Sequence, residues 1–180
     1  LSSLKKNILH ICIYIVMKYK QEKPLIKHVG FGNNFHQRNQ IGLDSAYKSD
    51  NKTYIDGENA YIAGTDNWKD VFNDWVKIPL GLTRYSQRYQ DADEILKNNP
   101  QVKKLTGNSL GGVVSLELQK NHPDRNYDVT TYAAPVVQMN DQKHTRFRKS
   151  GDLVSMFDSG AMTIGKGSFN LLQNHSYSGY

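Results

Sequence analysis

The sequence contains one cysteine and no apolar stretch long enough to cross a bilayer. A single thiol, Cys12, cannot form an internal disulfide. The cysteine content therefore does not indicate whether the protein resides in an oxidising or a reducing compartment. Cys12 lies within the most apolar stretch, ILHICIYIVM at residues 8–17, and we interpret it as a small hydrophobic side chain. A membrane-spanning helix needs about 20 residues, so this stretch is too short. Two lysines precede it as in a signal peptide, but no small-residue cleavage site follows.

The chain also lacks a metal-ligand cluster and a nucleic-acid-binding motif. Its net charge of +6 would by itself favour an anionic partner, but the charge is unevenly distributed. Residues 1–27 hold six of the 23 basic residues and only one of the 17 acidic residues. We therefore expect no nucleic-acid partner, no metal and no other cofactor. Residues 1–27 are interpreted as a solvated basic arm, with contact to an anionic lipid surface as the alternative.

The beginning of this arm has two interpretations. The chain starts with Leu1, and its first methionine is Met17. If Met17 is the true start, residues 1–16 are not native. In the other interpretation they form a buried first strand or helix. Residues 28–180 are expected to form a single domain, because a chain of 180 residues suffices for one buried core. A cytoplasmic location and carriage within a larger particle both stay open.

Strand-like and helix-like runs alternate along residues 28–180. We expect a mostly parallel α/β fold with helices on both faces of the sheet, since this alternation is typical of βαβ units. The Asp56-Gly57 turn signal predicts a hairpin within residues 52–65. The further predictions are a loop at 28–38, helices at 39–50, 84–100 and 110–120, and strands at 101–107, 127–135 and 145–149.

A helix is also predicted around residues 68–76, within the segment 67–78. Trp68, Val71, Phe72, Trp75 and Val76 follow the i, i+3, i+4, i+7, i+8 spacing of one apolar helix face. Such a face packs against the core or lies at a lipid surface. We favour the core interpretation.

The segment LTGNSLGG, residues 105–112, places one serine in a glycine frame. Gly107, Ser109 and Gly111 fit the pattern G-x-S-x-G between a predicted strand and a predicted helix. In this context the serine occupies a sharp, strained turn that exposes its hydroxyl, and side chains two residues away on either side would collide. The following helix directs its positive end at the serine, where an oxyanion would develop. Ser109 is therefore the predicted nucleophile, with a plain glycine-rich turn as the alternative.

A serine nucleophile needs a histidine base, and the expected order along the chain is serine, acid, histidine. His122 ends the helix that starts at Ser109, roughly 20 Å away at 1.5 Å per residue. His10, His28 and His36 precede the serine, and His144 precedes the best acid candidate. His175, in NHSYSGY near the end of the chain, has the required order.

The acid candidate is Asp152, which lies in a Ser-Gly-Asp turn after a short predicted strand. The carboxyl end of a strand would present it at the edge where Ser109 lies. Asp128 begins a strand and would lie at the opposite edge. Asp141 and Asp158 are the further candidates.

At these motifs the chain resembles the class 3 lipases of the α/β-hydrolase fold. The resemblance covers residues 41–180 and rests on YIAGTDNW, KDVFNDW, KLTGNSLGG, TTYAAP, RFRKSGDLVSMF and NHSYSGY, in the family's order. It implies that Thr65, after Gly64, and Leu110 supply the amides of the oxyanion hole, and that Asp152 and His175 complete the triad. The family most often has histidine before the nucleophile, where this chain has Asn108. The chain is also shorter than typical members. In the family the segment after the oxyanion residue often forms a lid that opens at a lipid surface, which is the alternative for residues 67–78.

The resemblance implies an ester or lipid substrate, an acyl-enzyme formed on Ser109 and transient contact with a lipid surface. Two other functions stay open. One is another acyl-transfer enzyme of the same fold, such as a thioesterase, an acyltransferase or a peptidase, because the fold alone does not separate these activities. The other is a non-catalytic binding module, which a complete triad disfavours.

Overall fold

A computed structural model of the chain describes residues 33–65, 86–136, 144–152, 155, 158 and 160–164. The predicted basic arm at 1–27, the predicted helix at 68–76, Asp141 and the predicted base His175 lie outside these residues.

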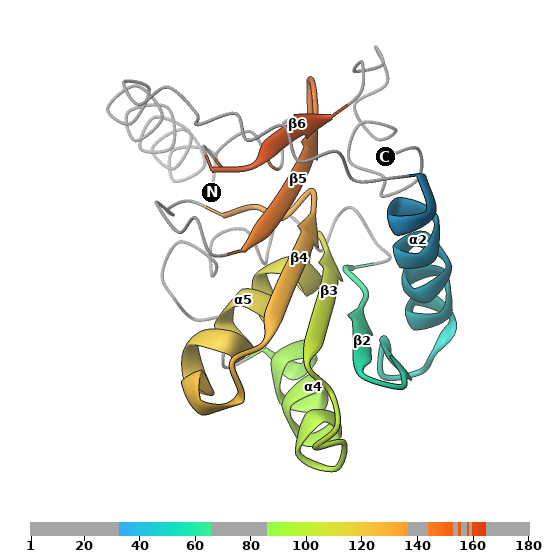
Figure 1. The fold of residues 1–180 in the computed structure, drawn as a ribbon, viewed down its shortest axis with the longest axis vertical. Coiled ribbons are helices and arrows are strands. Elements are labelled where there is room, and N and C mark those ends of the chain that lie inside the picture. The colour runs from blue at the N-terminus through green and yellow to red at the C-terminus, as the bar shows by residue number, and fades with distance from the viewer. Residues whose placement is uncertain are drawn as a thin grey trace, which may run out of the picture.

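Six strands in the described residues form one sheet in the order β1-β2-β3-β4-β5-β6 (Figure 1). β1 and β2 pair antiparallel, and each later strand runs parallel to its neighbour. The predicted α/β class with a mostly parallel sheet is thereby confirmed. The strands are β1 (Thr53–Asp56), β2 (Asn59–Ile62), β3 (Lys104–Asn108), β4 (Asp128–Tyr132), β5 (Thr145–Lys149) and β6 (Met162–Ile164).

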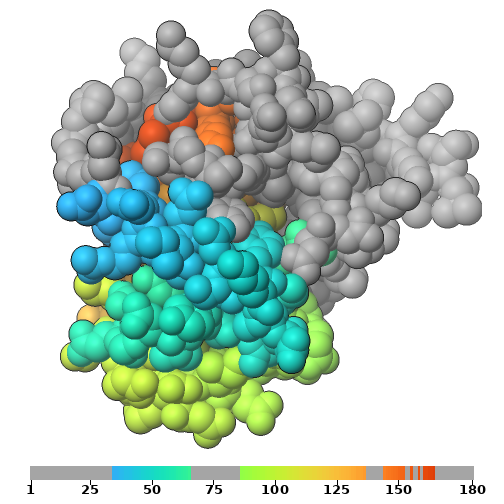
Figure 2. Space-filling view, turned by 90° about the vertical axis from the view of Figure 1, so that its right-hand side faces the viewer, coloured from blue at the N-terminus to red at the C-terminus, as the bar shows by residue number. Residues whose placement is uncertain are grey.

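Helices cover both faces of the sheet, as the sequence predicts (Figure 1). α2 (Asn33–Lys48) packs on one face, and α4 (Gln87–Lys97) and α5 (Leu110–Asn121) pack on the other. Successive residues of a strand point to opposite faces. Ile62 of β2 therefore joins the core beneath α4 and α5, whereas its neighbour Tyr61 joins the core beneath α2. Figure 2 shows α2 beside the β1–β2 hairpin on one face of the molecule.

The β1–β2 hairpin confirms the prediction from Asp56-Gly57. Thr53 pairs with Ile62 and Asp56 pairs with Asn59. Gly57 has φ +57°, a left-handed conformation that glycine adopts without steric cost. The turn brings the carboxyl end of β2 to the same sheet edge as the ends of the later parallel strands.

The prediction of a loop at residues 28–38 is wrong over 33–38, because α2 already begins at Asn33. The buried face of α2 includes Asn39, Leu43 and Ala46, but its first half is polar and shows little apolar periodicity. His36 Nδ1 and Asn39 Nδ2 each lie 3.0 Å from the buried hydroxyl of Tyr132 on β4. These hydrogen bonds let polar residues occupy the core-facing side of the helix.

The other elements predicted within the described residues are present, and one strand there was not predicted. Ser86 caps α4 by accepting a hydrogen bond from the Tyr89 amide at 3.2 Å. α4, α5, β3, β4 and β5 fall within one or two residues of their predicted ranges or inside them. The sequence analysis missed β6, which has three residues and depends on its pairing with β5.

Candidate active site

The carboxyl ends of four neighbouring strands carry the residues of the candidate site. Gly64 and Thr65 follow β2, Ser109 follows β3, Ala133 follows β4, and Asp152 follows β5. These four strands are parallel, so their carboxyl ends meet at one sheet edge. Open α/β sheets bind ligands at this edge. Asp128 instead begins β4, opposite Lys104 at the start of β3, as predicted for the opposite edge.

Ser109 occupies a strained turn between β3 and α5. Its φ of 52° and ψ of −123° lie outside the regions that side-chain-bearing residues normally adopt. Its amide donates to the Tyr132 carbonyl at 2.9 Å, and its own carbonyl accepts from the Gly112 amide at 3.0 Å. The neighbouring strand β4 and the first turn of α5 therefore both hold the unusual conformation in place.

The glycine frame around Ser109 is required by close backbone contacts. A Cβ atom at Gly107 would overlap the backbone of Gly111, and a Cβ atom at Gly111 would overlap the carbonyl of Ile62. Behind them, a Cβ atom at Gly112 would lie 2.8 Å from the Cβ of Ala134. α5 thus crosses directly against β2 and β3, and any larger residue would push the helix away from the serine.

The two residues predicted for the oxyanion hole flank the serine on different elements. Leu110 is the first residue of α5, where backbone amides have no partner within the helix. Thr65 follows Gly64, and a Cβ atom on Gly64 would lie 2.9 Å from the Cβ of Ser109. The loop after β2 and the start of α5 are therefore both adjacent to the serine.

A second strained residue lies on the next strand. Ala133 has φ 51° and is fully buried. Its amide donates to the Phe147 carbonyl of β5 at 2.8 Å. The strained conformations of Ser109 and Ala133 therefore both fall at the carboxyl edge of the sheet, where such strain concentrates in active sites.

Asp152 lies in the turn after β5 and is 2% exposed. Its Oδ2 accepts a hydrogen bond from Ser155 Oγ at 2.6 Å, and its amide donates to the Lys149 carbonyl at 3.3 Å. Ser155 was not identified from the sequence, where a serine in a turn gives no signal of its own. The Ser155 hydroxyl fixes the orientation of the carboxylate and stabilises its charge.

Asp158, a further acid candidate, has a different partner. Its Oδ2 lies 3.1 Å from Nε of Arg146 on β5, and both side chains are buried. Burial raises the pKa of Asp158, while the charge of Arg146 acts in the opposite direction. This carboxylate therefore neutralises a buried guanidinium.

The contacts described for His36 and His122 are with residues other than Ser109. His122 ends α5, as predicted, and its Nε2 lies 2.7 Å from Asp93 Oδ1 of α4. His36 lies among Phe35, Tyr132 and Phe147, and burial lowers its pKa. His144 directly precedes β5, at its amino end.

Tyr47 and Asn108 connect the loop after β2 to the serine turn, and the sequence analysis did not identify their roles. The Gly64 amide donates to the Tyr47 hydroxyl at 3.1 Å, and that hydroxyl donates to Asn108 Oδ1 at 2.6 Å. Asn108 Nδ2 then donates to the Tyr132 carbonyl at 3.1 Å. No local signal marks Tyr47, because its partner lies 61 residues away along the chain.

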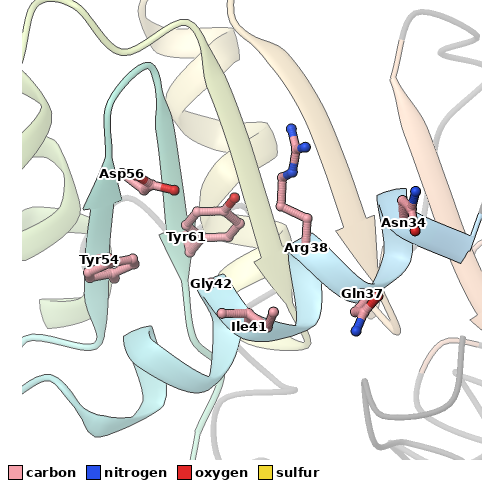
Figure 3. Close-up of a pocket in the computed structure, with 8 residues that line it drawn as sticks. All are labelled: Asn34, Gln37, Arg38, Ile41, Gly42, Tyr54, Asp56 and Tyr61. Carbon is pink, nitrogen blue, oxygen red and sulfur yellow. The ribbon is translucent and has the colours of Figure 1, made fainter.

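A separate hollow of about 400 Å³ lies between α2 and the hairpin (Figure 3). It contains Ile41, which is 61% exposed, and the stacked rings of Tyr54 and Tyr61. None of its lining residues is a predicted site residue. The lining consists of Asn34, Gln37, Arg38, Ile41, Gly42, Tyr54, Asp56 and Tyr61.

The described residues contain neither a helix that could span a membrane nor a cluster of metal-ligating side chains. None of the helices there is long and apolar enough to span a bilayer. No group of three or more histidine, cysteine, aspartate or glutamate side chains in those residues is arranged to hold a metal ion.

No family model and no curated protein matches the sequence. Among solved structures, the chain is similar to the Lip2 lipase from Yarrowia lipolytica, with 19% sequence identity and a TM-score of 0.36. The alignment covers 55% of this chain and 53% of that chain, so this chain spans about half the length of the lipase it matches. Any activity is therefore inferred from the residues around Ser109.

Proposed function

We propose that this protein is a serine hydrolase that cleaves carboxylic esters, with lipid esters such as acylglycerols or phospholipids as the substrate class. The observation that carries the proposal is the strained backbone of Ser109 between β3 and α5. Such a conformation costs about 1–3 kcal/mol and persists only where the surrounding structure enforces it. A hydroxyl raised on a strand-to-helix turn is the arrangement that nucleophilic serines use.

In the proposed reaction Ser109 Oγ attacks the ester carbonyl while His175 accepts the hydroxyl proton. The tetrahedral intermediate collapses to an acyl-enzyme, and His175 returns the proton to the departing alcohol. Water activated by His175 then attacks the acyl-enzyme and releases the acid and the free serine. A serine hydroxyl is a weak nucleophile without such a base, which is why the histidine is needed.

Asp152 is proposed as the acid that orients His175 and offsets its positive charge. Its place after β5, its burial and its hydrogen bond from Ser155 support this role. A buried and oriented carboxylate stabilises the imidazolium that forms during the reaction. Asp158 is less suited, because its carboxylate is paired with Arg146.

The amides of Thr65 and Leu110 are proposed to stabilise the oxyanion. Support comes from the place of Leu110 in the first turn of α5, where backbone amides have no partner within the helix, and from the close approach of Gly64 to Ser109. The positive end of α5 adds to this stabilisation. Losing one such donor typically lowers the rate by about 10²–10³-fold.

The test is hydrolysis of p-nitrophenyl esters from acetate to palmitate by the wild type and Ser109→Ala. Ser115→Ala is the matched control: Ser115 is buried like Ser109 but lies within α5, and among the contacts described its hydroxyl bonds only to the Gly111 carbonyl. We expect Ser109→Ala to lower kcat roughly 10⁴-fold or more, and Ser115→Ala to retain activity. The preferred acyl length separates a lipase from a small esterase.

A fluorophosphonate probe provides a second readout, because it labels only an activated serine. Labelling of the wild type and not of Ser109→Ala would support the proposal. A folded wild-type protein that hydrolyses no ester and takes up no probe would contradict it and favour the binding-module alternative.

A further inference from the structure

We propose that Tyr47 is a positioning residue for the oxyanion hole: its hydroxyl holds the Gly64 amide so that the Thr65 amide faces the oxyanion beside Ser109. The inference rests on the proposed function and adds a residue that the predicted triad and oxyanion hole do not include. Tyr47 lies in the last turn of α2, on the opposite face of the sheet from α5.

The Tyr47 hydroxyl occupies the space between the ends of β2 and β3. It accepts from the Gly64 amide at 3.1 Å and donates to Asn108 Oδ1 at 2.6 Å. A phenol has one proton to donate, so this arrangement sets the direction of both bonds. The Gly64 amide therefore bonds to the Tyr47 hydroxyl, and the next amide along the chain, that of Thr65, is the one proposed to face the oxyanion.

Position 64 has no room for a side chain, and its backbone needs an external contact to fix its orientation. A Cβ atom there would lie 2.9 Å from the Tyr47 oxygen and 2.9 Å from the Cβ of Ser109, so a larger residue would displace one or both. Glycine also has the widest backbone freedom of any residue. An external hydrogen bond is therefore needed to hold the peptide that follows it in one orientation.

The same chain of hydrogen bonds ends on the nucleophile turn. Asn108 Nδ2 donates to the Tyr132 carbonyl at 3.1 Å, and that carbonyl also accepts from the Ser109 amide at 2.9 Å. Asn108 is 2% exposed, and hydrogen bonds shielded from water are stronger and more directional. The position of the oxyanion amide is thereby coupled to the position of the serine.

Lys52 fixes the end of α2 that carries Tyr47. Its Nζ donates to the Tyr47 carbonyl at 2.6 Å, and its own carbonyl accepts from the Ala63 amide at 2.9 Å. A cation at the carboxyl end of a helix also stabilises the unpaired carbonyls there. Backbone and side chain of Lys52 therefore connect α2 to the end of β2, directly before Gly64.

The first experiment compares Tyr47→Phe with Tyr89→Phe as the matched control. The Tyr89 hydroxyl accepts one hydrogen bond from Asn121 at 2.9 Å, on the face covered by α4 and α5. Each variant loses a hydroxyl from a tyrosine that is buried or partly buried, with two described hydrogen bonds lost in Tyr47→Phe and one in Tyr89→Phe. Tm is therefore measured for both variants, and kcat is compared per folded protein. Tyr47→Phe should lower kcat about tenfold or more with little change in KM, since an oxyanion contact acts in the transition state.

A boronic acid that forms an anionic tetrahedral adduct on Ser109 separates positioning from a general loss of structure. We expect its Ki to rise in Tyr47→Phe by the same factor as kcat falls, and to stay unchanged in Tyr89→Phe. In the wild type, amide NMR should show the Thr65 resonance shifting on boronate binding while the Gly64 amide stays protected from exchange. This measurement needs no variant, so it decides the inference even if Tyr47→Phe does not fold.

The outcomes separate this inference from the proposed function. An active wild type in which the two tyrosine variants behave alike, or in which the Gly64 amide shifts and the Thr65 amide does not, overturns the role of Tyr47 alone. A wild type that neither hydrolyses esters nor takes up the fluorophosphonate probe overturns the proposed function, and the role of Tyr47 with it.

Discussion

Gly111 in the first turn of α5 lies directly against the backbone carbonyl of Ile62 at the end of β2. A methyl group at position 111 would overlap that carbonyl, and neither backbone segment can move without displacing the sheet or the helix. We expect Gly111→Ala to lower the free energy of unfolding by about 3 kcal/mol, at the upper end of the cost of overpacking. Urea denaturation followed by circular dichroism measures the change.

Gly57→Ala is the control for this substitution. Gly57 has φ +57°, and nothing lies within 4 Å of its added Cβ, so the variant experiences backbone strain without a clash. The expected cost is about 1–2 kcal/mol. Equal losses of stability in the two variants would show that contact with Ile62 does not matter.

The strain at Ser109 predicts that removing the nucleophile in two ways has different effects on stability. Ser109→Ala keeps a side chain at φ 52°, whereas Ser109→Gly relieves the conformation. Both should be inactive, and the glycine variant should be about 1 kcal/mol more stable than the alanine variant. Thermal unfolding of the two purified variants tests this. An alanine variant as stable as the glycine variant would argue against stored strain.

Two buried aspartates of equal exposure should respond differently to the same substitution. Asp152→Asn should lower kcat by about 10⁴-fold and leave the fold intact, because the carboxylate is proposed to hold the correct histidine tautomer. Asp158→Asn should lower stability by about 3–5 kcal/mol, because it leaves the buried guanidinium of Arg146 without its counter-charge. Ester hydrolysis and urea denaturation of both variants give the comparison.

The opposite result would reverse the roles assigned to Asp152 and Asp158. If Asp158→Asn abolished activity without loss of stability while Asp152→Asn remained active, Asp158 would be the triad acid. Activities are therefore normalised to the folded fraction, so that unfolding of Asp158→Asn is not mistaken for a catalytic effect.

His36 should make stability depend on pH. Burial lowers its pKa below the ordinary value of 6.5, so the unfolded chain takes up a proton more readily than the folded protein. Its contribution to stability is complete above pH 6.5 and is lost as the pH falls from there through the folded pKa. His36→Phe retains an aromatic ring beside Phe147 and should remove this part of the dependence. Urea titrations at several pH values measure it, and identical slopes in both proteins would contradict the assignment.

Tyr132 should make the stability of the protein depend on pH in the alkaline range. Burial raises its pKa to about 12 from an ordinary value of 10, with hydrogen bonding from Asn39 acting in the opposite direction. The folded protein then keeps the phenolic proton where the unfolded chain has lost it, so stability should fall as the pH rises above 10. Tyr132→Phe should show a smaller decrease over that range, measured by thermal unfolding. An unchanged decrease would assign the effect to other groups.

Local sequence signals predicted those parts of the site that depend on neighbouring residues. Asp56-Gly57 predicted the hairpin, because a left-handed turn needs glycine at that position. Gly107, Ser109 and Gly111 predicted the strained turn, because side chains two residues before and after the serine would collide in a sharp turn from strand to helix. Each of these signals lies within a few residues of the feature it predicts.

The first half of α2 could not be predicted in this way. Its core-facing positions include polar residues such as Asn39, and a polar run without apolar periodicity reads as a loop. Their partner is the Tyr132 hydroxyl, 93 residues from Asn39 along the chain. Burial of a polar side chain is favourable only once that partner is in place.

The sequence by itself determined the α/β alternation, the hairpin and the glycine-framed serine turn, because helix and strand periodicity and backbone sterics act over short stretches of chain. Only the tertiary structure decided that Tyr47 bonds to Gly64 and Asn108, and that Arg146 pairs with Asp158. The contacts of Tyr47 form where the ends of the parallel strands β2 and β3 meet at one sheet edge, and the Arg146–Asp158 pair forms because both side chains are buried beside β5. Strand register and burial therefore determine which polar and charged side chains become partners.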